Sequence, residues 1–264
     1  MNLNDISTQL LYTTAPLWVE RRDGSQIFGT GFFYAVPLKA QPERQVVLLV
    51  TNHHVVENAA RALVDLVERA GDGPKRGARV RVEMPGDAIL RHTDAAVDLA
   101  MIPIGGVLNE LEHAGKAIFF RSVAPELVPS DEAVEQLAAV EEITFIGYPS
   151  GLYDQRNVTP LVRRGITATP PWNDFQGQRA FLIDAGVFPG SSGSPVFILN
   201  QGAYATREGI SLGNRLLFMG VLSEAIVRQE KDVPQVFLGL GKVIKATVVS
   251  TFASGLAGRL IGAG

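Results

Sequence analysis

Residues 186–197 read Gly186-Val-Phe-Pro-Gly-Ser-Ser-Gly-Ser-Pro-Val-Phe197 and contain the pattern that decides the fold. Glycines lie on both sides of Ser192, and their backbone freedom suits a tight turn that exposes a serine hydroxyl. The same freedom allows main-chain N–H groups to approach a substrate carbonyl and form an oxyanion hole. A Gly/Ser turn alone is more often a simple connection between strands. The stretch predicts a nucleophile only together with a base and an acid elsewhere in the chain.

A base and an acid both precede this turn. Residues 46–56 read Val-Val-Leu-Leu-Val-Thr-Asn-His-His-Val-Val, an apolar strand that runs into His53 and His54. Residues 97–104 read Val-Asp-Leu-Ala-Met-Ile-Pro-Ile, in which Asp98 opens another apolar strand. A serine nucleophile needs a histidine to take its proton and a carboxylate to orient that histidine. These segments supply one group for each role.

The chain order of the three groups separates the possible folds. No histidine follows Ser192, which excludes the α/β-hydrolase order, and position 194 is serine, so the Gly-x-Ser-x-Gly pattern fails. The subtilisin order needs an acid before the histidine within a βαβ pattern, and none of the early acids lies in one. Histidine, then aspartate, then serine is the chymotrypsin order.

Most apolar segments are short, rich in β-branched or aromatic residues, and bounded by Gly, Pro, Asn or Asp, which is typical of strands. The predicted strands are 16–21, 27–36, 45–51, 79–84, 88–92, 99–104, 142–147, 161–169, 180–185, 195–199, 215–223 and 236–240. Six strands in each half predict an all-β protein with two six-stranded antiparallel barrels, because closure removes exposed sheet edges.

Three segments indicate helices, at 3–11, 131–140 and 242–260. Ser130 is a suitable N-cap for the second, with acidic residues in the first turn. We expect residues 1–115 to form the barrel with the histidine and the aspartate, and residues 142–264 to form the barrel with Ser192 and a C-terminal helix. Residues 116–141 would link the two barrels and include a short helix.

The composition limits the classes of protein that fit. Hydrophobic residues are 46% of the 264 residues and charged residues 19%, which excludes disorder for most of the chain. The net charge of −3 argues against a nucleic-acid partner, which needs a basic face. There is no cysteine, and His92 and His113 lack metal-ligand spacing. We therefore expect no disulfide, no metal and no cofactor.

Neither a signal peptide nor a membrane helix is predicted. The N-terminus has Asp5 before any basic residue and contains no long apolar run. The longest uncharged stretch, 185–206, is rich in Gly, Ser and Pro, which excludes a membrane-spanning helix. We expect no membrane association and a cytoplasmic location.

Six segments in order resemble the trypsin-like serine proteases of the chymotrypsin clan, most closely the bacterial HtrA-type branch. They are Gly29-Thr-Gly-Phe-Phe33, Val50-Thr-Asn-His-His-Val-Val56, Asp98-Leu-Ala-Met-Ile102, Ile146-Gly-Tyr-Pro149, Arg164-Gly-Ile166 and Pro189-Gly-Ser-Ser-Gly-Ser-Pro195. The resemblance implies two perpendicular barrels with the active site between them. The residues after position 240 are too few for the PDZ domain usual in HtrA proteins, so we expect none.

The resemblance assigns roles to particular residues. The family pattern Val-Thr-Asn-x-His-Val-Val makes His54 the base and leaves His53 at the variable position, facing away if the segment is a strand. Asp98 opens the Asp-Leu-Ala strand and would orient the base, whereas Asp94 lies in the preceding turn. Ser192 would be the nucleophile.

Further roles are implied on both sides of Ser192. The N–H groups of Gly190 and Ser192, assisted by Ser191, would form the oxyanion hole. Substrate would lie along a strand just downstream by β-augmentation. The walls of the specificity pocket would be, on one side, Gly186, Val187 and Phe188, and on the other side Ser223, Glu224 and Ala225. Because the floor residue Gly186 is uncharged, a small or medium apolar substrate residue is expected there.

These assignments predict a serine endopeptidase that cleaves peptide or protein substrates through an acyl-enzyme intermediate. Two alternatives remain open, because function depends on the site and not on the fold. One is a protease-fold module that binds a partner with little or no activity. The other is a protease domain that acts only within a larger defence or signalling assembly. The sequence predicts no oligomeric state.

Overall fold

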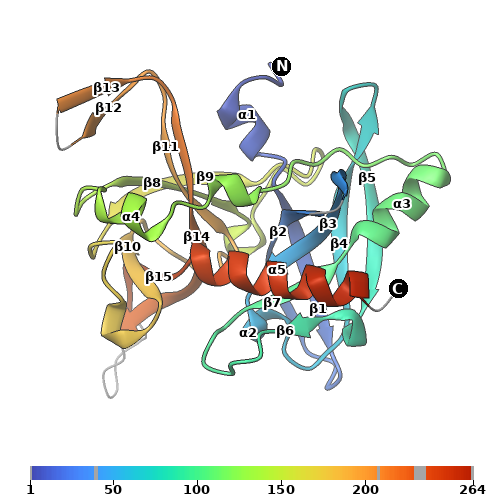
Figure 1. Cartoon of the computed structure of the whole chain (residues 1–264). Coiled ribbons are helices and arrows are strands. Elements are labelled where there is room, and N and C mark those ends of the chain that lie inside the picture. The colour runs from blue at the N-terminus through green and yellow to red at the C-terminus, as the bar shows by residue number, and fades with distance from the viewer. Residues whose placement is uncertain (1, 39–40, 207–208, 229–235, 263–264) are drawn as a thin grey trace.

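Antiparallel strands are the main secondary structure of the molecule, in two groups that follow each other along the chain (Figure 1). The computed structural model describes residues 2–38, 41–206, 209–228 and 236–262. The first group is a seven-stranded sheet in the order β5-β4-β1-β2-β3-β7-β6. Its strands are β1 (Thr14–Arg21), β2 (Gln26–Leu38), β3 (Gln41–Thr51), β4 (Ala59–Ala70), β5 (Gly73–Pro85), β6 (Leu90–Arg91) and β7 (Ala100–Pro103). The prediction of a closed six-stranded barrel in this half is corrected to a seven-stranded sheet, with β5 and β6 at its two edges.

The additional strand is β4, which pairs with β1 on one side and β5 on the other. Its residues Ala62, Val64 and Leu66 alternate along the strand and are all buried. Alternate side chains of a strand lie on the same face of the sheet, so these three pack into one core. Without β4, strands β1 and β5 would have no shared neighbour.

The second group is a closed six-stranded barrel in the order β10-β15-β14-β11-β8-β9, as predicted. Its strands are β8 (Glu142–Gly147), β9 (Leu161–Thr167), β10 (Ala180–Asp184), β11 (Pro195–Asn200), β14 (Arg215–Arg228) and β15 (Val236–Lys245). A separate hairpin of β12 (Ala203–Thr206) and β13 (Gly209–Leu212) extends from the barrel between β11 and β14 (Figure 1). This hairpin is not among the strands predicted from the sequence.

Short helices lie before and between the strands, and one long helix, α5, follows the last strand. The α-helices are α1 (Ile6–Leu10), α2 (His53–Val56), α3 (Gly105–His113), α4 (Asp131–Glu135) and α5 (Ala246–Gly262); the 3₁₀ turns are η1 (Gly86–Ala88), η2 (Pro125–Leu127), η3 (Pro149–Gly151) and η4 (Phe175–Gly177). The predicted cap of α4 is confirmed, because the Ser130 Oγ accepts a hydrogen bond from the Ala133 N–H at 3.2 Å.

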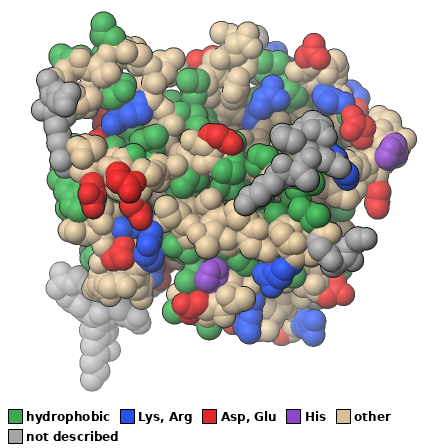
Figure 2. Space-filling model, viewed as in Figure 1, with side chains coloured by type: hydrophobic (Ala, Val, Ile, Leu, Met, Phe, Trp, Pro, Cys, Tyr) green, Lys and Arg blue, Asp and Glu red, His purple; other side chains and the backbone are tan. Residues whose placement is uncertain are grey.

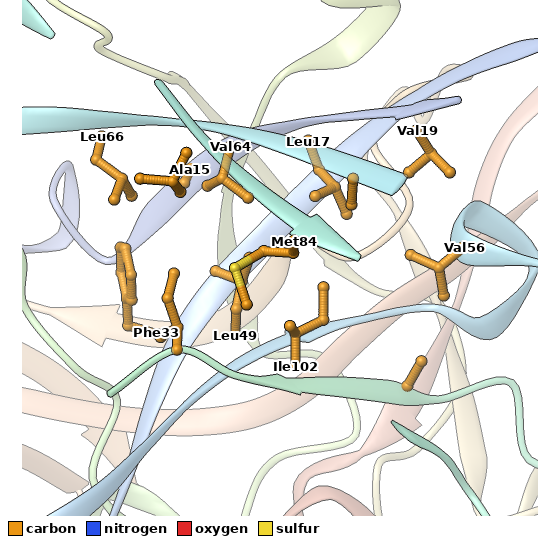
Figure 3. Packing of buried hydrophobic residues seen from close by; sticks show 14 of the residues in the cluster. Ala15, Leu17, Val19, Phe33, Leu49, Val56, Val64, Leu66, Met84 and Ile102 are labelled. Atoms are coloured by element: carbon orange, nitrogen blue, oxygen red, sulfur yellow. The ribbon is translucent and has the colours of Figure 1, made fainter. Parts of the chain in front are cut away.

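Buried apolar side chains fill each group of strands and also the space between the two groups. Figure 3 shows the core of the seven-stranded sheet, which includes Leu49 and Met84. A second core joins the two halves: Phe32 of β2 lies 5.5 Å from Phe218 of β14, measured between ring centroids. Phe33, the next residue of β2, belongs to the core of the sheet instead. Strand β2 is therefore buried on both faces, which positions the sheet firmly against the barrel.

Helix α5 crosses both halves of the molecule (Figure 1). Its residues Val249 and Phe252 pack into the core shared by the two groups of strands. We predicted that this helix begins at residue 242, but β15 continues to Lys245, because Val243 pairs with Leu222 of β14 and is fully buried. None of the helices in the described ranges is long and apolar enough to span a membrane. Acidic and basic side chains are interspersed on the face shown in Figure 2.

Candidate active site

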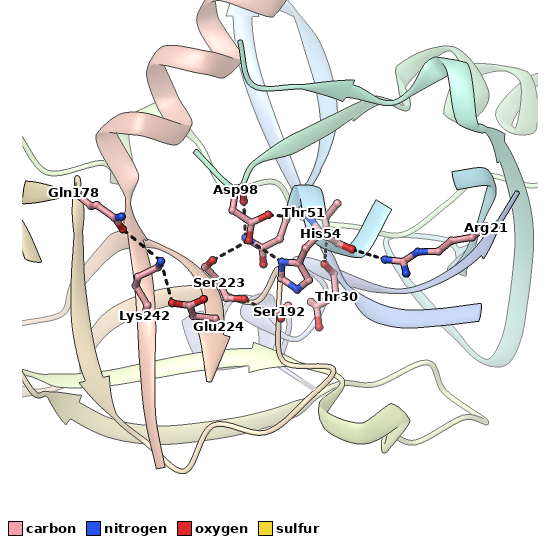
Figure 4. Close-up of polar contacts among 11 residues, drawn as sticks. Arg21, Thr30, Thr51, His54, Asp98, Gln178, Ser192, Ser223, Glu224 and Lys242 are labelled. Carbon is pink, nitrogen blue, oxygen red and sulfur yellow. Dashed lines mark hydrogen bonds and ion pairs between the residues drawn. The ribbon is translucent and has the colours of Figure 1, made fainter. Parts of the chain in front are cut away.

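The predicted base, His54, lies just after strand β3, whose last residues, 47–51, are buried (Figure 4). The strand ends at Thr51, and the four residues of α2 follow, with Val55 and Val56 buried in the core of the sheet. The His54 side chain remains 47% exposed. We expected His53 and His54 to point apart as neighbours on a strand; they lie on one turn of helix instead. The His53 Nδ1 is buried and has no hydrogen-bond partner among the described residues.

Asp98 binds His54 through both of its carboxylate oxygens. Its Oδ2 accepts a hydrogen bond from the His54 Nδ1 at 2.7 Å, and its Oδ1 accepts one from the His54 backbone N–H at 2.9 Å. The Ser223 Oγ also donates to Asp98 Oδ2, at 2.9 Å. Burial opposes ionisation of Asp98, but the hydrogen bonds from His54 and Ser223 outweigh it and lower the pKa of Asp98 below its usual value. An ionised Asp98 fixes the proton on Nδ1 and leaves Nε2 of His54 free to accept one.

Ser192 lies on the turn between β10 and β11, on the barrel side of the site (Figure 4). Its Oγ donates a hydrogen bond to the backbone carbonyl of Ser223 at 2.9 Å. No hydrogen bond joins Ser192 and His54 in the described part of the chain. Ser223 therefore connects Asp98 with Ser192, because its hydroxyl donates to Asp98 and its carbonyl accepts from Ser192.

The three predicted oxyanion-hole residues are not equivalent. The Ser191 N–H already donates to the Phe188 carbonyl at 3.1 Å, and its side chain is fully buried. The N–H groups of Gly190 and Ser192 donate no hydrogen bond to any described residue. Gly190 has a φ of 85°, a left-handed conformation that glycine adopts without strain. Gly190 and Ser192 are thus the two of these three residues whose backbone N–H groups have no partner among the described residues.

Thr30 of β2 holds the serine turn from the opposite half of the molecule, and it is not among the site residues predicted from the sequence. Its N–H donates to the Ser192 carbonyl at 2.9 Å, and its Oγ1 donates to the Gly190 carbonyl at 3.2 Å. The same Oγ1 accepts a hydrogen bond from the Tyr148 N–H at 3.2 Å. The Gly29-Thr-Gly-Phe-Phe33 motif contained this residue, but the contact spans 160 positions and no local pattern indicates it.

The sequence matches the model of the trypsin-like peptidase domain over residues 29–204, a range that includes His54, Asp98 and Ser192. This chain belongs to the trypsin-like peptidase family. No curated protein matches its sequence. Among the described residues of this trypsin-like peptidase, no group of three or more His, Cys, Asp or Glu side chains could hold a metal ion.

Solved structures share the fold of this trypsin-like peptidase at low sequence identity. The HtrA-type protease AlgW, solved with a tripeptide, is 15% identical with a TM-score of 0.52, over 94% of this chain and 61% of that one. A serine endoprotease from Yersinia pestis is 15% identical with a TM-score of 0.54, over 97% and 67%. The HL collagenase is 15% identical with a TM-score of 0.55, over 95% of each chain. The chain thus spans 61% of the length of AlgW.

The two predicted pocket walls of the trypsin-like peptidase are both attached to β15. On the first wall, the N–H groups of Ala185 and Val187 donate to the Gly239 carbonyl at 3.1 and 3.4 Å. On the second wall, Ala225 pairs with Gly241. From the sequence, Gly239-Leu-Gly241 reads as a joint between a strand and a helix; both glycines instead lie within β15 and contact the pocket segments.

The side chains of the two walls differ in exposure. On the first wall Val187 is buried and Phe188 is 42% exposed, and Gly186 has a φ of 57°. On the second wall Ser223 is buried, while the exposed Glu224 forms an ion pair with Lys242 at 3.0 Å. The predicted residues therefore lie on two segments that β15 connects.

Proposed function

We propose that this chain is a serine endopeptidase in which Ser192 is the nucleophile, His54 the general base and Asp98 the group that orients the base. The observation that supports this most is the pairing of His54 with Asp98, whose carboxylate accepts hydrogen bonds from the His54 ring at 2.7 Å and from its backbone N–H at 2.9 Å. The proposal assigns the base and the acid to residues 1–115 and the nucleophile to residues 142–264, with residues 116–141 between them.

The reaction would begin when the Ser192 hydroxyl leaves the Ser223 carbonyl and turns toward His54. One rotation about the serine Cα–Cβ bond changes the direction of the hydroxyl. His54 Nε2 then takes the hydroxyl proton while Oγ attacks the substrate carbonyl carbon, and Asp98 stabilises the imidazolium that forms. The N–H groups of Gly190 and Ser192 would bind the oxygen of the tetrahedral intermediate.

The intermediate would collapse when His54 returns its proton to the leaving amine, which breaks the peptide bond and leaves Ser192 acylated. Water would hydrolyse the acyl-enzyme with His54 again as the base. Substrate backbone would lie along residues 223–225 by β-augmentation. Peptides or proteins are the substrates that such a site accepts.

A test of the proposal is covalent labelling of the purified chain by a fluorescent fluorophosphonate. We expect one label per chain, and none after Ser192→Ala, because the probe reacts only with an activated serine. The matched control is Ser25→Ala, which removes an exposed serine in the turn between β1 and β2. Equal labelling of Ser192→Ala and the wild type would contradict the assignment of the nucleophile.

The same experiment addresses the alternative, a module that binds a partner through this fold. The Ser192–Ser223 hydrogen bond favours that alternative, because it directs the hydroxyl away from His54. A chain that is never labelled but binds an unmodified peptide would be such a module. We favour the peptidase because the base and the acid are already joined at 2.7 Å.

A further inference from the structure

Arg163 of β9 lies close to the first wall of the predicted specificity pocket. Alternation along β9 puts Arg163 and Gly165 on one face of the strand. At Gly165 a side chain has no room, because a Cβ there would lie 2.2 Å from the Asp184 carbonyl oxygen. This close approach brings the same face of β9 against the segment that leads into Gly186.

The guanidinium of Arg163 lies where a side chain of the floor residue would be. A Cβ added to Gly186 would be 2.8 Å from Nη2 of Arg163. The Arg163 Cζ also lies 5.2 Å from the centroid of the Phe188 ring, on the same wall. Because Gly186 has no side chain, the guanidinium of Arg163 from β9 can occupy the space beside it.

This cation has no acidic partner in the described part of the chain. No described carboxylate lies within 4.0 Å of Arg163, although the residue is half-buried. Its neighbour Arg164 is exposed and forms an ion pair with Glu142 at 2.6 Å. On the opposite wall, Glu224 is already paired with Lys242. A half-buried guanidinium binds carboxylates through short, charge-assisted hydrogen bonds, so an incoming carboxylate gains most at this position.

We propose that Arg163 is a specificity-determining residue, which makes the site select substrates with Asp or Glu immediately before the scissile bond. The inference rests on the proposed peptidase function and deepens it. It replaces the expectation of an apolar residue at that position, which considered only the uncharged Gly186. The carboxylate of the substrate would enter between the two walls and form an ion pair with the Arg163 guanidinium.

The test compares cleavage rates of matched peptides that differ only in the residue before the scissile bond. The pairs are Glu with Gln and Asp with Asn, and peptides with Leu and Lys complete the set. We expect the wild type to cleave the Glu peptide roughly tenfold faster or more than the Gln peptide, measured as kcat/KM. Arg163→Gln should bring that ratio close to one, and Arg163→Glu should favour the Lys peptide.

Arg164→Gln is the matched control, because it removes the adjacent guanidinium on the other face of β9. It should leave the Glu-to-Gln ratio unchanged. The ratio is the readout rather than the rate, because a general loss of folding would lower both rates together. If Arg163→Gln lowers the cleavage rates of the Glu and Gln peptides equally, the inference is overturned. Arg163 would then only pack against the Phe188 ring.

Fluorophosphonate labelling separates this inference from the proposed function. The probe lacks a side chain for the specificity pocket, so it reports the reactivity of Ser192 alone. A labelled wild type that prefers Leu and ignores the charge of the substrate would overturn the role of Arg163 and leave the peptidase intact. A wild type without labelling would overturn both.

Discussion

The seven-stranded sheet and the six-stranded barrel hold their parts of the site in different ways. In the sheet, side-chain hydrogen bonds fix His54, since Asp98 contacts both its ring and its backbone N–H. In the barrel, backbone hydrogen bonds and glycines fix the turn around Ser192, with Thr30 contacting two of its carbonyls. The difference indicates that the sheet side depends on the chemistry of a carboxylate, whereas the barrel side depends on backbone conformation.

Asp98→Asn tests whether the sheet holds His54 through the carboxylate of Asp98, and it has the largest expected effect. We expect kcat on a peptide substrate to fall by about 10⁴-fold, because an amide favours the wrong tautomer of the base. Asp94→Asn is the matched control: Asp94 accepts a hydrogen bond from the Ala96 N–H in a turn and contacts neither His54 nor Ser192 among the described residues. Less than a tenfold loss in Asp98→Asn would show that Asp98 does not orient the base.

Gly193→Ala tests the barrel side. Gly193 has a φ of 87°, and a Cβ there would lie 1.9 Å from the Thr30 carbonyl oxygen. We expect the free energy of unfolding to fall by about 3 kcal/mol and the labelling rate of Ser192 to fall about 10²-fold, because the turn must move. Denaturant unfolding and fluorophosphonate kinetics measure the two effects.

Gly24→Ala separates conformational strain from the steric clash. Gly24 has a similar φ of 82°, but no atom lies within 4 Å of a Cβ added there. This variant should lose only about 1 kcal/mol and label at the wild-type rate. Equal losses in both variants would mean that the approach of Thr30 to Gly193 contributes nothing.

The sequence predicted most of the fold but not β4, and the reason is local composition. Residues 59–70 contain Ala, Leu, Arg and Glu, which are strong helix formers, and this propensity hides the alternation of Ala62, Val64 and Leu66. Tertiary pairing with β1 and β5 overrides that preference. The start of α5 was predicted too early because residues 242–245 were assigned to the helix. Val243 and Ile244 instead extend β15 by pairing with β14.

At the site, the sequence predicted the groups that belong to ordered motifs, and the structure brings His54 and Asp98 within hydrogen-bond distance. It did not predict Thr30 or Arg163. Thr30 contacts a residue 160 positions away in the chain, and Arg163 lies close to Gly186 and Phe188 of another segment. No local pattern in the sequence indicates either contact. Contacts of this kind depend on how the sheet packs against the barrel and how β9 lies beside the residue 186 segment.

Thr30→Val probes the connection between the two halves. Valine has nearly the same shape as threonine but leaves the buried Tyr148 N–H and the Gly190 carbonyl without their partner. We expect a loss of about 1–3 kcal/mol in the free energy of unfolding and roughly a tenfold lower kcat/KM. Thr13→Val is the control, because it removes a buried hydrogen bond to the Leu10 carbonyl at the end of α1. It should lower stability alone; a fall in kcat/KM as large as that of Thr30→Val would refute the positioning role.

The smallest effect we expect is a pH dependence of stability that comes from Asp98. Hydrogen bonds lower its pKa in the folded state, so its ionised form stabilises the fold above the unfolded pKa of about 3.9. This stabilisation is lost as the pH falls through the lowered pKa. The effect is modest because the side chain is 29% exposed and solvent screens it.

Urea unfolding of the wild type and Asp98→Asn between pH 7 and pH 2.5 isolates this contribution, because the other carboxylates are common to both chains. The wild type should be more stable at neutral pH, and the difference should narrow below about pH 4. A difference that stays constant to pH 2.5 would mean that folding does not lower the pKa of Asp98. The sheet would then hold His54 without a carboxylate that is kept ionised, and the contrast with the backbone-held serine turn would fail.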